Sequence, residues 1–149
     1  MIAGDKRLRR AYLLLILNLT VIWGNSLLPG EISGAISGFV RDLIAMLLPG
    51  DGAPGQGHGL LRKLAHFTEF ACLGAILSHI MGLMDKHRLL ALGLGFLAAC
   101  VDETIQIFVP DRGPAFTDVL IDTSGVLCGI LLLMAAMRLR QGKKISKEF

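Results

Sequence analysis

Four long apolar blocks constrain this chain more than any other feature. They occupy residues 11–28, 65–84, 89–109 and 118–137, and a helix that spans a bilayer needs about 20 mostly apolar residues. Hydrophobic residues make up 53% of the chain and charged residues only 18%, whereas a soluble domain carries about 25% charged residues. The sequence therefore predicts an all-α membrane protein, a single domain over residues 1–149 with four transmembrane helices. It excludes a water-soluble monomer and a disordered chain.

The basic residues predict how these spans are oriented. Lys and Arg gather at both ends of the chain and in the turn at residues 85–88, and such clusters favour the cytoplasmic side. We therefore expect both termini in the cytoplasm. Three basic residues fall on the outer side against this rule, which indicates a local use for them: Arg62, Lys63 and Arg112. No basic stripe is interleaved with aromatic residues, so no nucleic-acid partner is expected.

The outer connection between the first two spans has a helical pattern of its own. Apolar residues recur at helical spacing over residues 32–48, and Ser33 and Ser37 lie on the opposite face. This pattern predicts an amphipathic helix that lies in the outer interface of the membrane.

Ionisable side chains inside the predicted spans gather at one depth. At a rise of 1.5 Å per residue, Glu69, Asp102 and Asp122 lie roughly 6–10 Å below the outer boundary. Charged residues within a membrane are costly and by default indicate a functional site. We therefore predict a binding pocket that opens to the extracytoplasmic face, formed by Lys63, His66, Glu69, Asp102, Glu103, Gln106, Arg112, Asp118 and Asp122, with Asn25, Ser26, Ser33 and Ser37.

The small residues predict how the spans pack. Gly95 and Ala99 in the third span share a face with acids of that span, and so do Gly125 and Gly129 in the fourth. Because small residues let membrane helices approach closely, we expect these two pairs to pack directly on each other. Glu103 lies about 100° away from that face and is expected to point toward the first span.

The charges in the predicted pocket permit more than one kind of chemistry. Five close carboxylates in a low dielectric cannot all ionise without partners, so some should be protonated, salt-bridged or metal-bound. His66 and Glu69, three residues apart, could ligate a metal, but an ion-pair network that holds helices together is the favoured interpretation. The sequence therefore predicts no metal site and indicates no particular cofactor.

Three stretches of the sequence resemble the VanZ-like family. They are N-S-L-L-P-G-E at 25–31, K-x-x-H-x-x-E-F at 63–70, and D-E-x-x-Q at 102–106 followed by P-D-R at 110–112 and D-V-L-I-D-T-S-G at 118–125. One departure is Asp111, where the family pattern has glycine. The family takes its name from a protein of glycopeptide-antibiotic resistance clusters. The resemblance thus implies a multi-pass protein of the bacterial cell membrane and, for relatives, reduced susceptibility to lipoglycopeptides such as teicoplanin. It implies no settled biochemical activity.

Two functions remain open at this stage. The first is a binding protein whose pocket engages membrane lipids, a lipid-linked cell-wall precursor or a lipoglycopeptide, with Lys63 and Arg112 on a phosphate and the carboxylates on an amine. The second is an intramembrane enzyme that acts by acid–base or metal-assisted chemistry on a lipid-linked substrate. Its candidate catalytic residues are His66, Glu69, Asp102 and Glu103. A small transporter and a purely structural ion-pair network are weaker interpretations.

The predicted topology can be tested with a reporter that is active only outside the cytoplasm. Since the basic segments alternate with the four spans, a reporter fused after Phe149 should be silent. The same reporter inserted within residues 51–59 should be active. The reverse pattern would contradict both the topology and the outward direction of the pocket.

Overall fold

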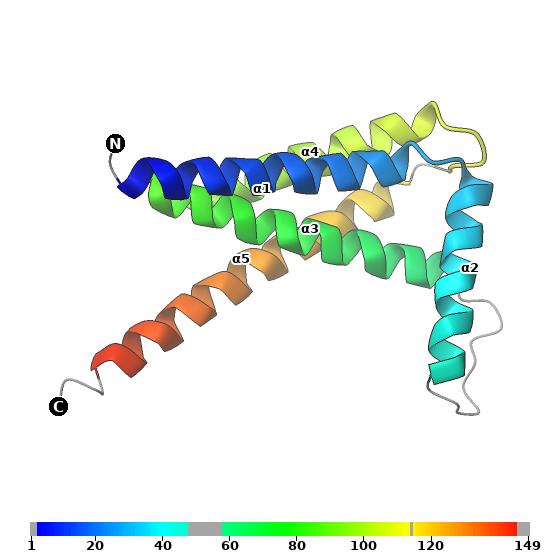
Figure 1. The fold of residues 1–149 in the computed structure, drawn as a ribbon. Helices are drawn as coiled ribbons and strands as arrows, with labels where there is room; N and C mark the ends of the chain where they lie inside the picture. Colours follow the sequence, from blue (N-terminus) through cyan, green and yellow to red (C-terminus); the bar gives the residue numbers. More distant parts are fainter. Residues whose placement is uncertain (1–2, 48–57, 114, 146–149) are drawn as a thin grey trace.

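Five helices form the part of the chain that the computed structural model describes, which is residues 3–47, 58–113 and 115–145. They are α1 (Ala3–Ser26), α2 (Gly30–Leu47), α3 (His58–Leu83), α4 (Leu89–Ile107) and α5 (Phe116–Ile145). These described residues contain no strand, which confirms the all-α prediction. Figure 1 shows α1, α3 and α4 running along one another, with α5 crossing the bundle and α2 lying across one end.

Three of these helices contain segments long and apolar enough to cross a membrane: Leu60–Leu83, Leu89–Ile107 and Phe116–Gln141. α1 meets the same criterion only together with the start of α2, as the pair Lys6–Ser26 and Gly30–Val40, whose axes are bent by 108°. Large apolar side chains are exposed along the outside of the bundle, among them Leu17 and Leu132, and an apolar surface of this extent suits lipid rather than water. The chain thus has the helices of a multi-pass membrane protein, with three spans and a fourth that depends on the bent pair.

The bend between α1 and α2 is centred on a proline. Because Pro29 has no backbone N–H, it cannot continue the hydrogen-bond ladder of α1, whose last bonds join Leu27 to Trp23 and Leu28 to Asn25. The carbonyl of Pro29 instead accepts from the N–H of Ser33, which starts the first turn of α2. The chain therefore turns sharply at this point, and α2 runs across the end of the bundle.

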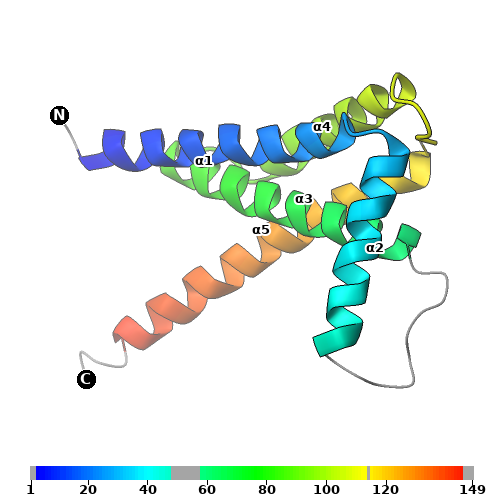
Figure 2. The same ribbon diagram turned by 45° about the vertical axis from the view of Figure 1, so that its right-hand side comes forward.

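α2 turns its two serines inward. Ser33 and Ser37 are half-buried against the bundle, whereas Ile32, Ile36 and Phe39 are exposed. Both views show α2 at the end of the bundle opposite to the two chain termini and the turn between α3 and α4 (Figures 1 and 2). The position of α2 in a membrane interface and the side on which the termini lie stay predictions.

The glycines of α5 pack against α3. A Cβ atom at Gly125 would lie 2.5 Å from the carbonyl oxygen of Phe67, and one at Gly129 would collide with the carbonyl oxygen of Ala71. The two backbones therefore meet directly, as small residues allow in membrane helices. Gly74 of α3 completes the contact, because a Cβ there would collide with the backbone of α5.

This packing contradicts the prediction that Gly95 and Ala99 lie directly on Gly125 and Gly129. Gly95 of α4 instead faces the side chain of Val126, whose γ carbons would lie 2.5 and 2.7 Å from a Cβ at position 95. The small residues of α5 do make a close helix contact, but their partner is α3. Spacing within a helix identifies the face that packs closely and does not say which neighbour it meets.

Replacing Gly129 with alanine should test this contact. The added methyl group would meet the backbone of Ala71, which cannot move aside as a side chain end can, so Gly129→Ala should lower the free energy of unfolding by about 1–3 kcal/mol. Gly93→Ala is the matched control, because nothing lies within 4 Å of a Cβ there. Thermal unfolding in detergent measures both. Equal stability of the two variants would contradict the packing described.

Candidate functional site

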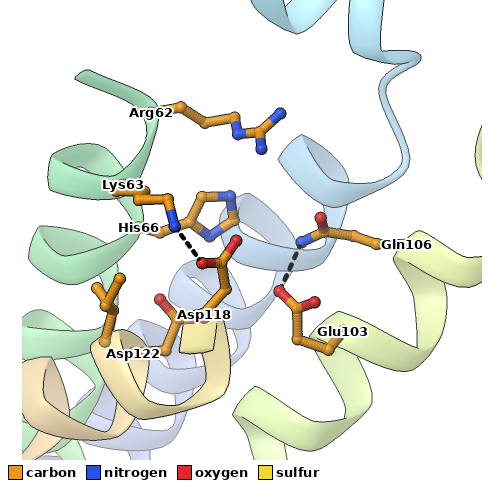
Figure 3. A pocket seen from close by; sticks show the side chains of 8 residues that line it. Arg62, Lys63, His66, Glu103, Gln106, Asp118 and Asp122 are labelled. Atoms are coloured by element: carbon orange, nitrogen blue, oxygen red, sulfur yellow. Dashed lines mark hydrogen bonds and ion pairs between the residues drawn. The ribbon is translucent and has the colours of Figure 1, made fainter. Parts of the chain in front are cut away.

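The residues of the predicted pocket lie at the end of the bundle that α2 covers. Figure 3 shows side chains from α3, α4 and α5 converging on one centre. Two adjoining cavities have these residues in their walls. The smaller, of about 10 Å³, is lined by Arg62, Lys63, His66, Glu103, Gln106, Asp118, Ile121 and Asp122. The larger, of about 100 Å³, is lined by Asn25, Leu28, Ser33, Ile36, Ser37, Arg62, Ala65, His66, Glu69 and Arg112.

Asp102 lies behind these cavities and joins α4 to α1. Its side chain is fully buried, and the hydroxyl of Ser26 donates to its Oδ1 at 2.7 Å. The amide of Gln106 donates to Oδ2 at 2.9 Å, and Nδ1 of His66 lies 3.8 Å from the same oxygen. A buried carboxylate requires such donors, so the network both satisfies Asp102 and fixes its direction.

Glu103 does not point toward the first span, and that prediction was wrong. Its Oε2 accepts a hydrogen bond of 2.9 Å from the backbone N–H of Ala115, just before α5, and its Oε1 accepts one of 3.4 Å from Gln106. The neighbouring Asp102 takes the contact with Ser26 instead. Successive residues on a helix differ by about 100° in direction, and the sequence does not say which of two adjacent acids meets which neighbour.

Glu69 connects α3 to the end of α1. The amide of Asn25 donates to its Oε1 at 2.6 Å, while Oε2 is buried and has no hydrogen-bond partner. This free oxygen belongs to a residue in the wall of the larger cavity. Glu69 therefore has an unused capacity to accept a hydrogen bond next to this cavity.

The basic residues Lys63 and Arg112 differ in whether all their donors are used within the protein. Lys63 makes an ion pair with Asp118, so its charge is used within the protein (Figure 3). Arg112 donates from Nε to the carbonyl of Leu28 at 3.1 Å and from Nη2 to that of Asn25 at 2.8 Å, while its Nη1 is buried without a partner. Burial and then the positive charge of Arg62 lower the pKa of Arg112, but a guanidinium remains protonated in proteins.

Arg62 was not among the predicted pocket residues, although it lines both cavities. Within the described part of the chain its guanidinium makes no hydrogen bond or ion pair, and Figure 3 shows it extending over the other side chains. One feature of the sequence could have identified Arg62 as a pocket residue: it lies on the predicted outer side, where positive charge is not favoured. Arg62 is thus a charge at the pocket that the fold does not use.

The turn that carries Arg112 contains Asp111, where the resemblance leads us to expect glycine. Asp111 adopts a φ of 57°, a left-handed conformation that glycine prefers and that aspartate tolerates better than most residues. The turn is also tied to the start of α2, because the N–H of Gly30 donates to the carbonyl of Pro110 at 3.1 Å. A Cβ at Gly30 would collide with the backbone of Asp111, so this approach requires glycine. Asp111 therefore adopts the backbone conformation expected of a glycine in the turn that carries Arg112.

A family model described as VanZ/LLP1 matches residues 11–138. The chain belongs to the VanZ/LLP1 family. The matched region includes every residue of the two cavities, and it confirms the family resemblance seen in the sequence motifs. No curated protein and no solved structure matches the chain.

The structure predicts different roles for the two arginines of the VanZ/LLP1 pocket. Arg112→Lys should lower the free energy of unfolding by about 1–3 kcal/mol, since lysine cannot reproduce the two bonds to the carbonyls of Leu28 and Asn25. Arg62→Lys should leave stability unchanged, because Arg62 has no partner among the described residues. Thermal unfolding of both variants in detergent makes the comparison. A larger loss for Arg62→Lys would refute this division.

Proposed function

We propose that this VanZ/LLP1 protein binds the phosphorylated headgroup of a membrane amphiphile in a pocket at the outer leaflet. The observation that carries the proposal is the larger cavity, whose walls contain two arginines with unused donors. Its volume of about 100 Å³ holds several water molecules or a group of the size of a phosphate. Arginine binds phosphate through several N–H donors at once, which gives strength and direction.

The structure favours Arg62 over Lys63 as the phosphate ligand. Lys63 is neutralised by Asp118, whereas Arg62 is free within the described residues and Arg112 has one buried, unpaired nitrogen. Both arginines are walls of the same cavity. The original assignment of Lys63 and Arg112 to a phosphate therefore becomes Arg62 and Arg112.

The same cavity contains an acceptor as well as donors. Glu69 has a buried oxygen without a partner, and Ser33 and Ser37 line the wall on α2. A headgroup with both a phosphate and an amine would use all of these groups, since the amine can donate to Glu69. A zwitterionic lipid such as phosphatidylethanolamine is thus the best fit to the polar groups.

The position of α2 gives such a lipid a route to the cavity. α2 exposes Ile32 and Phe39 on its outer side, 49% and 70% exposed, and turns Ser33 and Ser37 to the cavity. A helix of this kind lies at the boundary between headgroups and acyl chains. The cavity would then lie at headgroup depth, with apolar protein surface beside it.

Native mass spectrometry of the full chain in mild detergent can test this proposal. The probes are phosphatidylethanolamine, phosphatidylglycerol, a polyprenyl phosphate and, without phosphate, diacylglycerol. We expect retention of phosphorylated lipids, and Arg62→Gln should weaken it about tenfold because one charge-assisted interaction is lost. Arg138→Gln, an exposed arginine near the opposite end of α5, is the matched control.

Two results would contradict headgroup binding. One is equal retention of diacylglycerol and phosphorylated lipids, and the other is an Arg62→Gln variant that binds like the unchanged protein. Preference for the polyprenyl phosphate would identify a lipid-linked cell-wall precursor as the ligand. Susceptibility to teicoplanin of cells producing each variant then relates binding to resistance, which the family name suggests.

The second candidate is an intramembrane enzyme that acts on such a lipid. It is favoured by His66, whose Nδ1 is buried without a hydrogen-bond partner and lies 3.8 Å from Asp102. A histidine held beside a carboxylate can serve as a general base, with Glu69 and Glu103 as the other candidate acid–base groups. Release of inorganic phosphate from a polyprenyl pyrophosphate, lost in His66→Gln with lipid retention unchanged, would favour the enzyme. Retention without release favours the binding protein.

A further inference from the structure

Three side chains from three different helices converge at the bottom of the pocket. They are His66 of α3, Asp102 of α4 and Asp122 of α5, and one nitrogen or oxygen of each lies within 4.8 Å of the others. A tetrahedral zinc ion with bonds of about 2.0–2.2 Å places its ligand atoms roughly 3.4 Å apart. The pair His66 and Asp102, at 3.8 Å, is already close to that separation. The sequence pairing of His66 with Glu69 is not the one that the structure forms.

Asp122 supplies an independent observation. It is only 2% exposed, lines the smaller cavity, and accepts no hydrogen bond from any residue in the described parts of the chain. The Nδ1 atom of His66 also lacks a hydrogen-bond partner. A buried carboxylate without a partner is costly and must be neutralised by a proton or by a cation. Both unpartnered groups belong to residues that line the same cavity.

The size of this cavity and the charge around it fit a metal ion. About 10 Å³ is room for one water-sized occupant. Five carboxylates surround the two cavities, but only three side chains there carry a permanent positive charge: Arg62, Lys63 and Arg112. A divalent cation supplies the two missing positive charges.

We propose that His66, Asp102 and Asp122 bind a divalent transition-metal ion. One imidazole with two carboxylates suits Zn²⁺ or Mn²⁺ better than Ca²⁺, which prefers six to eight oxygen ligands. The surroundings of Asp102 resemble the outer shell of a metal site, since Ser26 and Gln106 hold its two oxygens in place. The proposal does not depend on lipid binding.

Metal content of the full chain, purified without a histidine tag, tests the proposal. After equilibration with Zn²⁺ or Mn²⁺ and removal of excess metal, mass spectrometry of the elements should find one ion per chain. His66→Gln and Asp122→Asn should each weaken binding at least tenfold, because each removes a ligand. His79→Gln is the matched control, since His79 is exposed on the same helix as His66.

A spectroscopic measurement on the unchanged protein tests the proposal even if the variants do not fold. Electron spin echo modulation of bound Mn²⁺ should show coupling to an imidazole nitrogen, which a site made of exposed carboxylates does not give. Absence of a bound ion, absence of this nitrogen coupling, or equal loss of metal in His79→Gln and His66→Gln would each overturn the proposal. Lipid retention is measured on the Asp122→Asn variant as well. A loss of metal with unchanged lipid retention would support the metal site independently of headgroup binding.

Discussion

The pocket depends on the direct contact between the backbones of α3 and α5. Gly125 lies against the carbonyl of Phe67, and these two residues are neighbours of the site: Phe67 follows His66, and Gly125 is one turn from Asp122. Because no side chain separates the helices there, His66 and Asp122 come within 4.8 Å of each other and of Asp102. A larger residue at Gly125 or Gly129 would push the helices apart and open the site. In a lipid environment, where burial of apolar surface does not drive helix association, close packing of this kind is a main source of stability.

Polar contacts hold the remaining elements around that pair. α1 reaches α4 through Ser26 and Asp102, and Arg112 holds the carbonyls of Asn25 and Leu28 where the helix ends. The carbonyl of Leu28 lies beyond the last bonds of α1, at the bend, whereas that of Asn25 also accepts from the N–H of Leu28. At membrane depth a backbone group without a partner costs several kcal/mol. One arginine therefore ties the turn after α4 to the end of α1, and the bond from Gly30 to Pro110 ties the same turn to the start of α2. These bonds give Arg112 a structural role, which would account for a positive charge on the side where the predicted topology does not favour one.

The sequence predicts the elements of this fold well, because apolar length, Pro29 and the alternation of polar and apolar residues are local signals. Most helix bounds lie within a few residues of the prediction. The exceptions are α1, which begins at Ala3 rather than at residue 11, α3, which begins at His58 rather than at residue 65, and α5, which extends to Ile145 rather than to residue 137. Local sequence signals do not show which neighbouring helix each helix face will contact. Gly125 and Gly129 could have met any neighbour, and the adjacent acids Asp102 and Glu103 each had two directions available. The same limit applied to Arg62 and Lys63, where only the structure shows which charge is already paired.

The distribution of charge in the pocket makes the proposed phosphate site compatible with the proposed metal site. Arg62 and Arg112 line the larger cavity with the serines of α2, whereas Asp102 and Asp122 are buried and lie beside His66. Without a phosphate, a cation at the three proposed ligands would be repelled by the two arginines. Without a cation, a phosphate at the arginines would be repelled by the acids. Each charge lowers the cost of the other, because opposite charges that are close in a low dielectric attract strongly. If both groups bind, the pocket would favour their joint occupancy, with the proposed cation held by His66, Asp102 and Asp122 and the proposed phosphate held by the two arginines. His66 lines both cavities and is therefore shared by the two proposed binding positions.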